Sequence, residues 1–356
     1  MDHFASVRSA LEEKGIDALL VTGGYNRRYV TGFPSSAGMA VITKEEAYFF
    51  VDSRYIEAAT AKIPGAVVWE AYAASAYVER VNEVLEKHGV ATLGFEEEEM
   101  NVAQFRNLEN SLKAALVPAQ EILWKLRAVK TPEELEIMRR AQRTAEAAYN
   151  DLLPRLNPGM TEREAAYELT YLMMQHGAED SSFDPIFVSG SASSMPHGVP
   201  RDVKLQKGFL TMDFGALVEG YCSDTTRTVC LGQPTLEMRE VYEIVRQAQA
   251  AGIAAAKGGA LGSDIDGAAR RVISDAGYGP YFGHSFGHCL GMEIHEPPYA
   301  ASRWEKPVPA GAVISAEPGI YLPGKFGVRI EDVLILTPEG NEDITDLPKD
   351  LVILDF

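Results

Sequence analysis

The sequence predicts a small α/β domain over residues 1–123, followed by a larger α+β domain over residues 124–356. Three observations predict this fold class. The chain has 356 residues, which exceeds the roughly 100–200 residues that one domain usually holds. In about the first 120 residues, short apolar runs alternate with amphipathic stretches, as in α/β domains. The rest of the chain repeats one order of helices and strands.

In the N-terminal domain, short apolar runs predict β-strands. These runs are residues 18–22, 39–42, 47–51, 67–69 and 92–95. Before the last run, residues 76–88 place Val78, Val81 and Leu85 on one face of a helix. We expect the domain to end between Leu123 and Lys130, where a basic stretch precedes a helix start.

The larger domain begins with a capping box. Thr131 stands at the N-cap, proline at the first helical position and Glu134 at the third, and Thr161 and Glu164 repeat the pattern. Four helices are expected, at residues 132–153, from residue 161 onwards, and at residues 236–257 and 263–277. Each pair of helices is followed by strand and loop sequence. We therefore expect two similar halves with pseudo-twofold symmetry and a cleft between them.

The charge and the cysteine content exclude several classes of protein. The 33 Lys and Arg residues against 51 Asp and Glu residues give a formal net charge of −18, which opposes binding to nucleic acid or to an anionic membrane. No run of about 18 uncharged apolar residues and no signal-peptide pattern occurs, so we expect a cytoplasmic protein. Cys222, Cys230 and Cys289 form no CxxC pair and are expected to be free thiols.

Five side chains in about the last 145 residues could bind metal ions. They are four carboxylates and one imidazole in strand-like or turn sequence, namely Asp213, Asp224, His288, Glu317 and Glu331. Asp213 and Glu317 each follow an apolar run that should be buried, and a buried carboxylate needs compensation. Carboxylate oxygens with one imidazole and no thiolate suit two Mn²⁺, Co²⁺ or Zn²⁺ ions that share a hydroxide. The set predicts metal-assisted hydrolysis at a carbonyl group.

The order and spacing of these residues resemble the motifs of the pita-bread metallopeptidases, specifically the Xaa-Pro peptidases (prolidase and aminopeptidase P). The matching segments are Asp213, Ser223-Asp-Thr-Thr-Arg-Thr228, His284-Ser-Phe-Gly-His288, His295-Glu296, Glu317-Pro-Gly-Ile-Tyr321 and Gly327-Val-Arg-Ile-Glu331. Residues 25–33 and 52–55 also resemble the extra N-terminal domain of these peptidases, which the related methionine aminopeptidases generally lack. The resemblance implies a pita-bread (creatinase/aminopeptidase-like) catalytic domain preceded by a creatinase-type α/β domain.

The resemblance also implies roles for the five candidate ligands. Asp213, Asp224, His288, Glu317 and Glu331 would bind two divalent metal ions, with Asp224 and Glu331 bridging them. Glu317 would also act as general acid and base, carrying a proton from the nucleophilic water to the leaving prolyl nitrogen. Manganese is the first expectation, and cobalt or zinc would fit as well.

Three histidines and one arginine complete the site that the resemblance implies. His295 is expected to polarise the scissile carbonyl group, His284 to line the cleft as a second catalytic and substrate-binding histidine, and His197 to contact the substrate. Arg329 lies two residues before Glu331, which would place both side chains on one face of a strand. It would bind a substrate carboxylate or form a structural ion pair within the site.

One residue departs from the family pattern. Cys289 follows the metal-binding histidine, where the family usually has glycine. A side chain here needs a negative φ, whereas glycine is free of this limit. We interpret the cysteine as a packing change, and the alternative is a thiol beside the metal ions.

Three further functions compete with that of a Xaa-Pro peptidase. Gly283-His-Ser285-Phe-Gly287 fits the nucleophile elbow of serine hydrolases, but only Glu293 could be the acid before the last histidine, His295. A methionine aminopeptidase-like peptidase and a non-catalytic binding protein would both be compatible with the same fold. We favour an enzyme that hydrolyses the N-terminal Xaa-Pro bond of dipeptides or short peptides. We expect it to be a homodimer that binds neither nucleic acid nor membranes.

Overall fold

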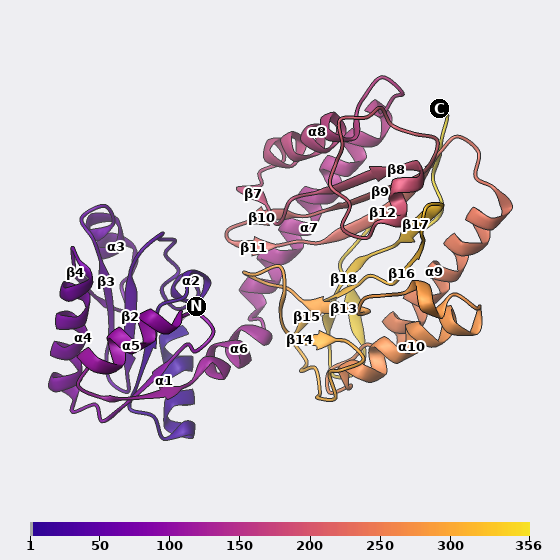
Figure 1. The fold of residues 1–356 in the computed structure, drawn as a ribbon. Coiled ribbons are helices and arrows are strands. Elements are labelled where there is room, and N and C mark those ends of the chain that lie inside the picture. The colour runs from indigo at the N-terminus through magenta and orange to yellow at the C-terminus, as the bar shows by residue number, and fades with distance from the viewer. Residues whose placement is uncertain (1–2) are drawn as a thin grey trace. The chain divides into compact units, whose positions relative to one another are not determined.

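The computed structural model describes residues 3–356 of the chain, which forms two compact units, Met1–Arg127 and Ala128–Phe356 (Figure 1). The boundary expected after residue 123 lies inside helix α6 (Gln120–Ala128). The division between the units falls at the end of this helix, between Arg127 and Ala128, within the expected stretch from Leu123 to Lys130. Within residues 3–356, no helix combines the length and the apolar composition that crossing a membrane requires.

The N-terminal unit is an α/β domain on one six-stranded sheet with the strand order β4-β3-β2-β1-β5-β6. Strand β2 pairs antiparallel with β1 and β3, and the remaining three pairings are parallel. The strands are β1 (Ala18–Val21), β2 (Met39–Thr43), β3 (Ala47–Val51), β4 (Val67–Glu70), β5 (Thr92–Phe95) and β6 (Ala115–Pro118). The helices before α6 are α1 (His3–Lys14), α2 (Gly24–Thr31), α3 (Ile56–Lys62), α4 (Ala74–His88) and α5 (Val102–Ser111).

The five predicted strands of this unit are all present, and one strand was missed. Strand β6 lies at the sheet edge, is only partly buried and ends at Pro118, a residue that weakens a strand pattern. The predicted amphipathic helix is α4, in which Val81 and Leu85 are buried against the sheet and Val78 is half-buried. Gly89 ends this helix in a left-handed conformation.

The sequence motif at residues 25–33 forms much of helix α2 and stabilises the N-terminal unit. Asn26 is fully buried, donates to Glu96 Oε1 over 2.7 Å and accepts from Arg127 Nη1 over 2.8 Å. The Glu96 carboxylate also accepts from the backbone N–H of Gly23 over 2.9 Å. The buried charge of Glu96 is thereby compensated by hydrogen-bond donors.

The C-terminal unit contains the two expected pairs of helices, each followed by strands. Its first half comprises α7 (Pro132–Leu152), α8 (Glu162–Gln175), β7 (Asp180–Ser181), β8 (Ile186–Ser189), β9 (Gly208–Phe214), β10 (Ala216–Val218), β11 (Tyr221–Cys222) and β12 (Thr225–Leu231). Its second half comprises α9 (Leu236–Ala255), α10 (Gly262–Asp275), β13 (Gly287–Cys289), β14 (Glu296–Ala300), β15 (Val313–Ala316), β16 (Gly319–Leu322), β17 (Phe326–Arg329), β18 (Asp332–Leu336) and β19 (Asn341–Asp343). Short 3₁₀ turns occur at Leu153–Arg155, Gly190–Ser194 and Gly279–Tyr281, and β20 (Ile353–Leu354) returns to pair with β12.

Both predicted capping boxes are confirmed. Thr131 Oγ1 accepts from the N–H of Glu134, whose carboxylate accepts from the N–H of Thr131 over 2.7 Å. Thr161 and Glu164 form the same pair of bonds at the start of α8. The two helices of the second half end earlier than expected, at Ala255 and Asp275.

The two halves of this unit share one topology. In each half, two helices precede three antiparallel strands, β8-β9-β12 in the first and β13-β15-β18 in the second. A small hairpin interrupts the link between the second and third strands, formed by β10–β11 in one half and by β16–β17 in the other. This arrangement confirms the predicted α+β fold with pseudo-twofold symmetry. It also places the ends of the second strands and the starts of the third strands of the two halves at equivalent positions.

Two hydrophobic cores lie between the helix pairs and the sheets, and the second one also includes Phe209 and Cys230 of the first half. Residues of α7 and α8 such as Tyr149 and Leu169 pack on Met212 and Val229 of the first sheet. Residues of α9 and α10 pack in the same way on β13, β15 and β18. The polar side chains described next therefore lie between two apolar cores.

Candidate active site

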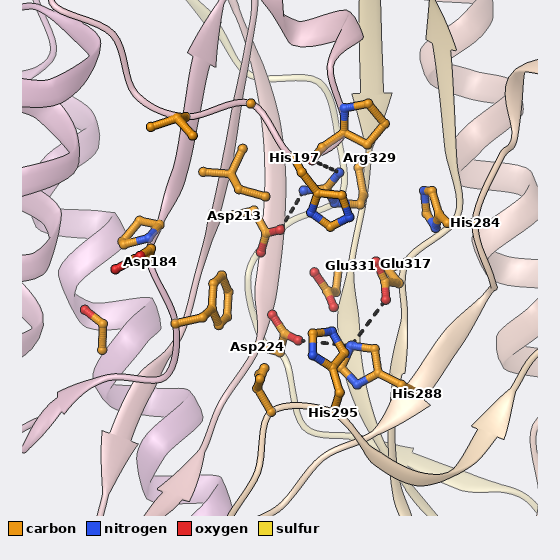
Figure 2. A pocket seen from close by; sticks show the side chains of 18 of the residues that line it. Asp184, His197, Asp213, Asp224, His284, His288, His295, Glu317, Arg329 and Glu331 are labelled. Carbon is orange, nitrogen blue, oxygen red and sulfur yellow. Dashed lines mark hydrogen bonds and ion pairs between the residues drawn. The ribbon is translucent and has the colours of Figure 1, made fainter. Parts of the chain in front are cut away.

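A cavity of about 1110 Å³ in the C-terminal unit is lined by every residue that the sequence predicted for the site. These residues are His197, Asp213, Asp224, His284, His288, His295, Glu317, Arg329 and Glu331 (Figure 2). They come from both halves of the unit, and the figure shows their side chains converging on one space. The structure therefore brings the nine predicted residues together.

The four carboxylates occupy equivalent positions in the two halves. Asp213 is the penultimate residue of β9, and Glu317 directly follows β15. Asp224 directly precedes β12, and Glu331 directly precedes β18. The same strand ends in the two halves thus present one carboxylate each, which the repeated topology explains.

His288 comes from β13, whose side chains alternate between the cavity and the core. A Cβ atom on the preceding Gly287 would lie 2.0 Å from the carbonyl oxygen of Ser315, so only glycine allows β13 to approach β15 this closely. The approach brings His288 Nε2 to 3.4 Å from Glu317 Oε1 and 3.6 Å from Asp224 Oδ2. Strand packing therefore sets the distance between the imidazole and the carboxylates.

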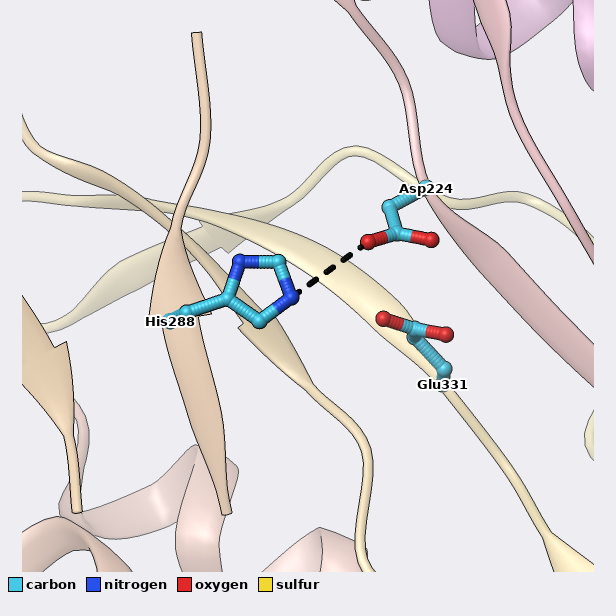
Figure 3. Close-up of side chains that lie close together, drawn as sticks. All are labelled: Asp224, His288 and Glu331. Carbon is cyan, nitrogen blue, oxygen red and sulfur yellow. Dashed lines mark ion pairs between the residues drawn. The ribbon is translucent and has the colours of Figure 1, made fainter. Parts of the chain in front are cut away.

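The imidazole of His288 is neutral and its free nitrogen faces the carboxylates. Its Nδ1 lies 3.1 Å from the carbonyl oxygen of Cys289, which can only accept, so Nδ1 carries the hydrogen. Burial lowers the pKa of His288 to about 3. Donor atoms of Asp224, His288 and Glu331 all lie within 4.8 Å of one another (Figure 3). A neutral histidine held by its second nitrogen is the usual form of a metal ligand.

Glu317, Asp224 and Glu331 resist ionisation in the metal-free site. Burial raises the pKa of Glu317 to about 8, and the nearby charge of Asp213 adds to this effect, whereas Arg329 opposes it. Burial and the neighbouring carboxylates raise the pKa values of Asp224 and Glu331 well above the ordinary range. In the absence of a cation, the cavity therefore favours the protonated, uncharged form of these three groups.

The donor atoms of the cavity suit divalent cations. Within residues 3–356, Asp213 Oδ1 and Glu331 Oε1 are buried oxygens without a hydrogen-bond partner. Buried carboxylate oxygens normally have a donor or a cation beside them. Oxygen ligands with one imidazole match the preferences of Mn²⁺, Co²⁺ and Zn²⁺. The residues present therefore fit a metal centre.

Arg329 forms an ion pair inside the site. Its Nη2 donates to Asp213 Oδ2 over 2.6 Å, and its Nε donates to Thr226 Oγ1 over 3.0 Å. Thr226 Oγ1 in turn donates to Glu331 Oε2 over 2.7 Å. The structure shows the ion pair expected as one of two roles for Arg329, and its binding of a substrate carboxylate stays a prediction.

The expectation that Arg329 and Glu331 share a face of one strand is wrong. Strand β17 ends at Arg329 and β18 begins at Asp332, so Glu331 lies in the link between them. The chain turns from one sheet to another there, and both side chains still line the cavity.

Tyr321 belongs to the hydrogen-bond network of the site, although sequence patterns assigned it no role. Its hydroxyl accepts from Arg329 Nη1 over 2.8 Å and lies 2.9 Å from His284 Nε2. His284 Nδ1 lies 2.9 Å from the carbonyl oxygen of Ser285, so Nδ1 carries the hydrogen and Nε2 accepts from Tyr321. Burial lowers the pKa of His284 to about 4. The signal that could have identified Tyr321 is its place at the end of the Glu317-Pro-Gly-Ile-Tyr321 motif.

His197 and His295 are the two exposed histidines of the cavity. The ring of His295 lies 4.2 Å from that of His288, measured between centroids, and Figure 2 shows the two side by side. Partial desolvation lowers the pKa of His295, so its ring is neutral near pH 7. Both histidines are placed where a ligand in the cavity would meet them.

The side chain of Cys289 lies in the apolar core and not beside Asp224, His288 and Glu331. It is fully buried in the core of the second half, where it pairs with Ile314 across the sheet. Its φ is not in the left-handed region, and burial raises the pKa of its thiol to about 12. The structure supports the packing interpretation and contradicts a thiol beside the metals. All three cysteines are free.

Comparisons with known proteins agree with this geometry. Residues 136–338 match the sequence model of metallopeptidase family M24, and residues 4–129 match the creatinase/prolidase N-terminal domain. The chain belongs to metallopeptidase family M24. The M24 chain is 35% identical over 349 residues to the Xaa-Pro dipeptidase of Pyrococcus furiosus, which covers 96% of this chain and 97% of that protein.

Solved structures of two proteins share the fold of this M24 chain. A Xaa-Pro dipeptidase from Bacillus anthracis is 40% identical with a TM-score of 0.94 and covers 99% of both chains. An X-Pro aminopeptidase from Thermotoga maritima is 34% identical with a TM-score of 0.89, over 96% of this chain and 98% of that one. These findings confirm the predicted family and do not favour the competing functions, because the N-terminal match is to the domain that methionine aminopeptidases generally lack.

Proposed function

We propose that this M24 chain is a metal-dependent peptidase that hydrolyses the Xaa-Pro bond at the N-terminus of dipeptides or short peptides. The convergence of four carboxylates and His288 in one cavity carries this proposal, together with the two partnerless buried oxygens of Asp213 and Glu331. The named activities of its relatives support the substrate class.

The five predicted ligands would hold two divalent ions. They are Asp213, Asp224, His288, Glu317 and Glu331, all of which line the cavity, and we expect Asp224 and Glu331 to be the ligands shared by both ions. When bound, such ions supply an activated water and a Lewis acid for the scissile carbonyl group. Manganese is the first candidate, and cobalt and zinc suit the same ligands.

Glu317 is the group best suited to carry a proton in this site. Its Oε1 lies 3.4 Å from His288 Nε2, among the candidate ligands, where it could exchange a proton with groups bound in the cavity. Ser315 Oγ donates to Glu317 Oε1 over 3.2 Å, which fixes the carboxyl group beside His288. The prolyl nitrogen of the substrate is tertiary and carries no hydrogen, so it must receive a proton before it can leave as an amine.

The exposed histidines would bind the substrate. His295 would donate from its neutral ring to the scissile carbonyl oxygen, and His197 would contact the substrate beside it. A direct role for His284 requires one of its ring nitrogens to change partner, because Ser285 and Tyr321 engage both. Arg329 would hold Asp213 and could meet a substrate carboxylate.

Hydrolysis of three peptides by the reconstituted enzyme tests the proposal. Apoprotein is loaded with Mn²⁺, Co²⁺ or Zn²⁺ and given Ala-Pro, Ala-Pro-Ala and Met-Ala-Ser. We expect release of alanine from the proline peptides, loss of activity with a chelator, and about two ions per chain by elemental analysis. Turnover of Met-Ala-Ser alone would indicate a methionine aminopeptidase. Fewer than one ion per chain without turnover would indicate a binding protein, and inhibition by a serine-directed phosphonate but not by a chelator would indicate a serine hydrolase.

The assembly and the location of the protein stay predictions. We propose a homodimer in the cytoplasm, as expected from the resemblance and the sequence. Light scattering after size-exclusion chromatography measures the mass in solution, and a monomer mass at micromolar concentration would contradict the dimer.

A further inference from the structure

The loop that carries His295 connects two residues that are paired with each other in the β-sheet. Cys289 of β13 and Glu296 of β14 are directly opposite each other in the sheet, and residues 290–295 leave the sheet between them. His295 is the last residue of this loop, and its ring lies against that of His288 (Figure 2). The position of His295 therefore depends on where the loop rejoins the sheet at Glu296.

A buried ion pair fixes that point. Lys130 Nζ lies 2.6 Å from Glu296 Oε1, and the two side chains are only 1% and 4% exposed. Lys130 directly precedes the N-cap Thr131 of α7, and its own N–H donates to the carbonyl oxygen of Gly311 over 3.0 Å. The cation of the pair thus comes from a segment that is itself held in place.

The start of the loop packs on the same ion pair. A Cβ atom on Gly291 would lie 2.5 Å from Glu296 Oε1 and 3.0 Å from Lys130 Cε, so the pair leaves no room for a side chain there. The carbonyl oxygen of Gly291 accepts from the N–H of Cys222 over 2.7 Å. The Lys130–Glu296 pair therefore contacts the start of the loop at Gly291 and includes Glu296, where the loop ends.

We propose that the Lys130–Glu296 pair is a positioning element for His295. A fully buried ion pair adds little net stability, because the cost of desolvating two charges offsets their attraction, and fixing one geometry is its best-supported use. Glu296 and His295 are consecutive, so a shift of the Glu296 backbone moves the imidazole. The inference rests on the proposed function, in which His295 contacts the scissile carbonyl group.

A double-mutant cycle between the pair and His295 tests this role. The variant K130M/E296Q removes both charges of the pair together. We expect its kcat for Ala-Pro to fall on the order of 10–100-fold with KM changed less than about threefold, since small misplacements of a catalytic group have effects of this size. We also expect unchanged metal content. In an H295A background, the same two substitutions should change kcat less than about twofold, because the residue through which they act is absent.

The matched control is R143M/E146Q, which removes another ion pair with a buried carboxylate. The side chain of Glu146 is 6% exposed, and neither residue lines the cavity. We expect its kcat to stay within about twofold of the wild type. If K130M/E296Q does not fold, K130R is measured in the same cycle, because arginine keeps the charge but not the shape of the donor.

Several outcomes would overturn the proposal. They are a wild-type kcat for K130M/E296Q, an equal fold-loss with and without His295, or an unmoved His295 ring in a crystal structure of the variant. A wild-type enzyme without activity on proline peptides would refute the proposed function instead. The crystallographic position of His295 would then still decide whether the pair places it.

Discussion

Loading the apoprotein with divalent ions should release protons, and the amount follows from the carboxylates of the site. Ligands bind metals in their deprotonated form, so protons held by the apoprotein must leave. Glu317, with a pKa of about 8, is about 0.9 protonated at pH 7 and about 0.1 protonated at pH 9. Asp224 and Glu331, whose pKa values are raised by burial, add to the release. His288 adds none, because its pKa of about 3 leaves it neutral at both pH values.

Isothermal titration calorimetry in buffers of different ionisation enthalpy measures this number of protons. We expect at least about 0.9 proton per chain at pH 7, with a smaller release at pH 9. E317Q should release about 0.9 proton fewer than the wild type at pH 7, and the two should nearly coincide at pH 9. The exposed Glu339 provides the control E339Q, which should match the wild type. Metal binding without proton release at pH 7, or equal release by E317Q, would refute the reasoning.

The same protons make the stability of the apoprotein depend on pH. The pKa of Glu317 rises from 4.5 in the unfolded chain to about 8 in the folded one, so the folded state binds more protons between these values. The free energy of unfolding should therefore decrease as the pH rises from 4.5 to about 8. Melting temperatures in excess chelator should fall over this range, and E317Q should flatten the decrease.

Substitutions of Tyr321 and Cys289 test whether each residue contributes to catalysis or only to packing. Tyr321→Phe removes the hydroxyl between His284 and Arg329, so we expect a loss of about 1–3 kcal/mol in the free energy of unfolding together with a lower kcat. Tyr242→Phe, which removes a hydroxyl bonded to a backbone carbonyl, should affect stability alone, and equal kcat losses in both variants would contradict the role of Tyr321. Cys289→Gly should lower the free energy of unfolding by about 2 kcal/mol in urea denaturation and leave kcat unchanged. A lower kcat at unchanged stability would contradict the packing interpretation.

Features of the fold that depend on residues close together in the sequence could be predicted. The capping boxes at Thr131 and Thr161 involve residues three positions apart, so their pattern is visible in the sequence. Strand β6 was missed because a half-exposed edge strand ending in Pro118 has little local signal. The helix ends of the second half were placed late because the sequence continues to favour helix beyond Ala255 and Asp275.

The composition of the site was predictable, but its internal contacts were not. Motif order identified nine of the residues that line the cavity. The pairing of Arg329 with Asp213 joins residues 116 positions apart, and that of Lys130 with Glu296 joins residues 166 positions apart. Such contacts depend on how the sheets and halves of the domain pack. No local pattern reports this packing, so Tyr321 could not be linked to its two neighbours from sequence.

The four carboxylates of the site lie where the two halves of the C-terminal unit meet, so bound metal ions would also link the halves. The surface where the halves meet carries Asp213 and Asp224 from one side and Glu317 and Glu331 from the other. Divalent ions bound by both sets would crosslink the halves across this polar boundary. Without the ions, the ion pairs Arg329–Asp213 and Arg227–Asp332 remain as polar contacts between the halves. Removal of the ions would therefore loosen the polar part of the boundary, while the ion pairs and the apolar contacts of Phe209 still join the two halves.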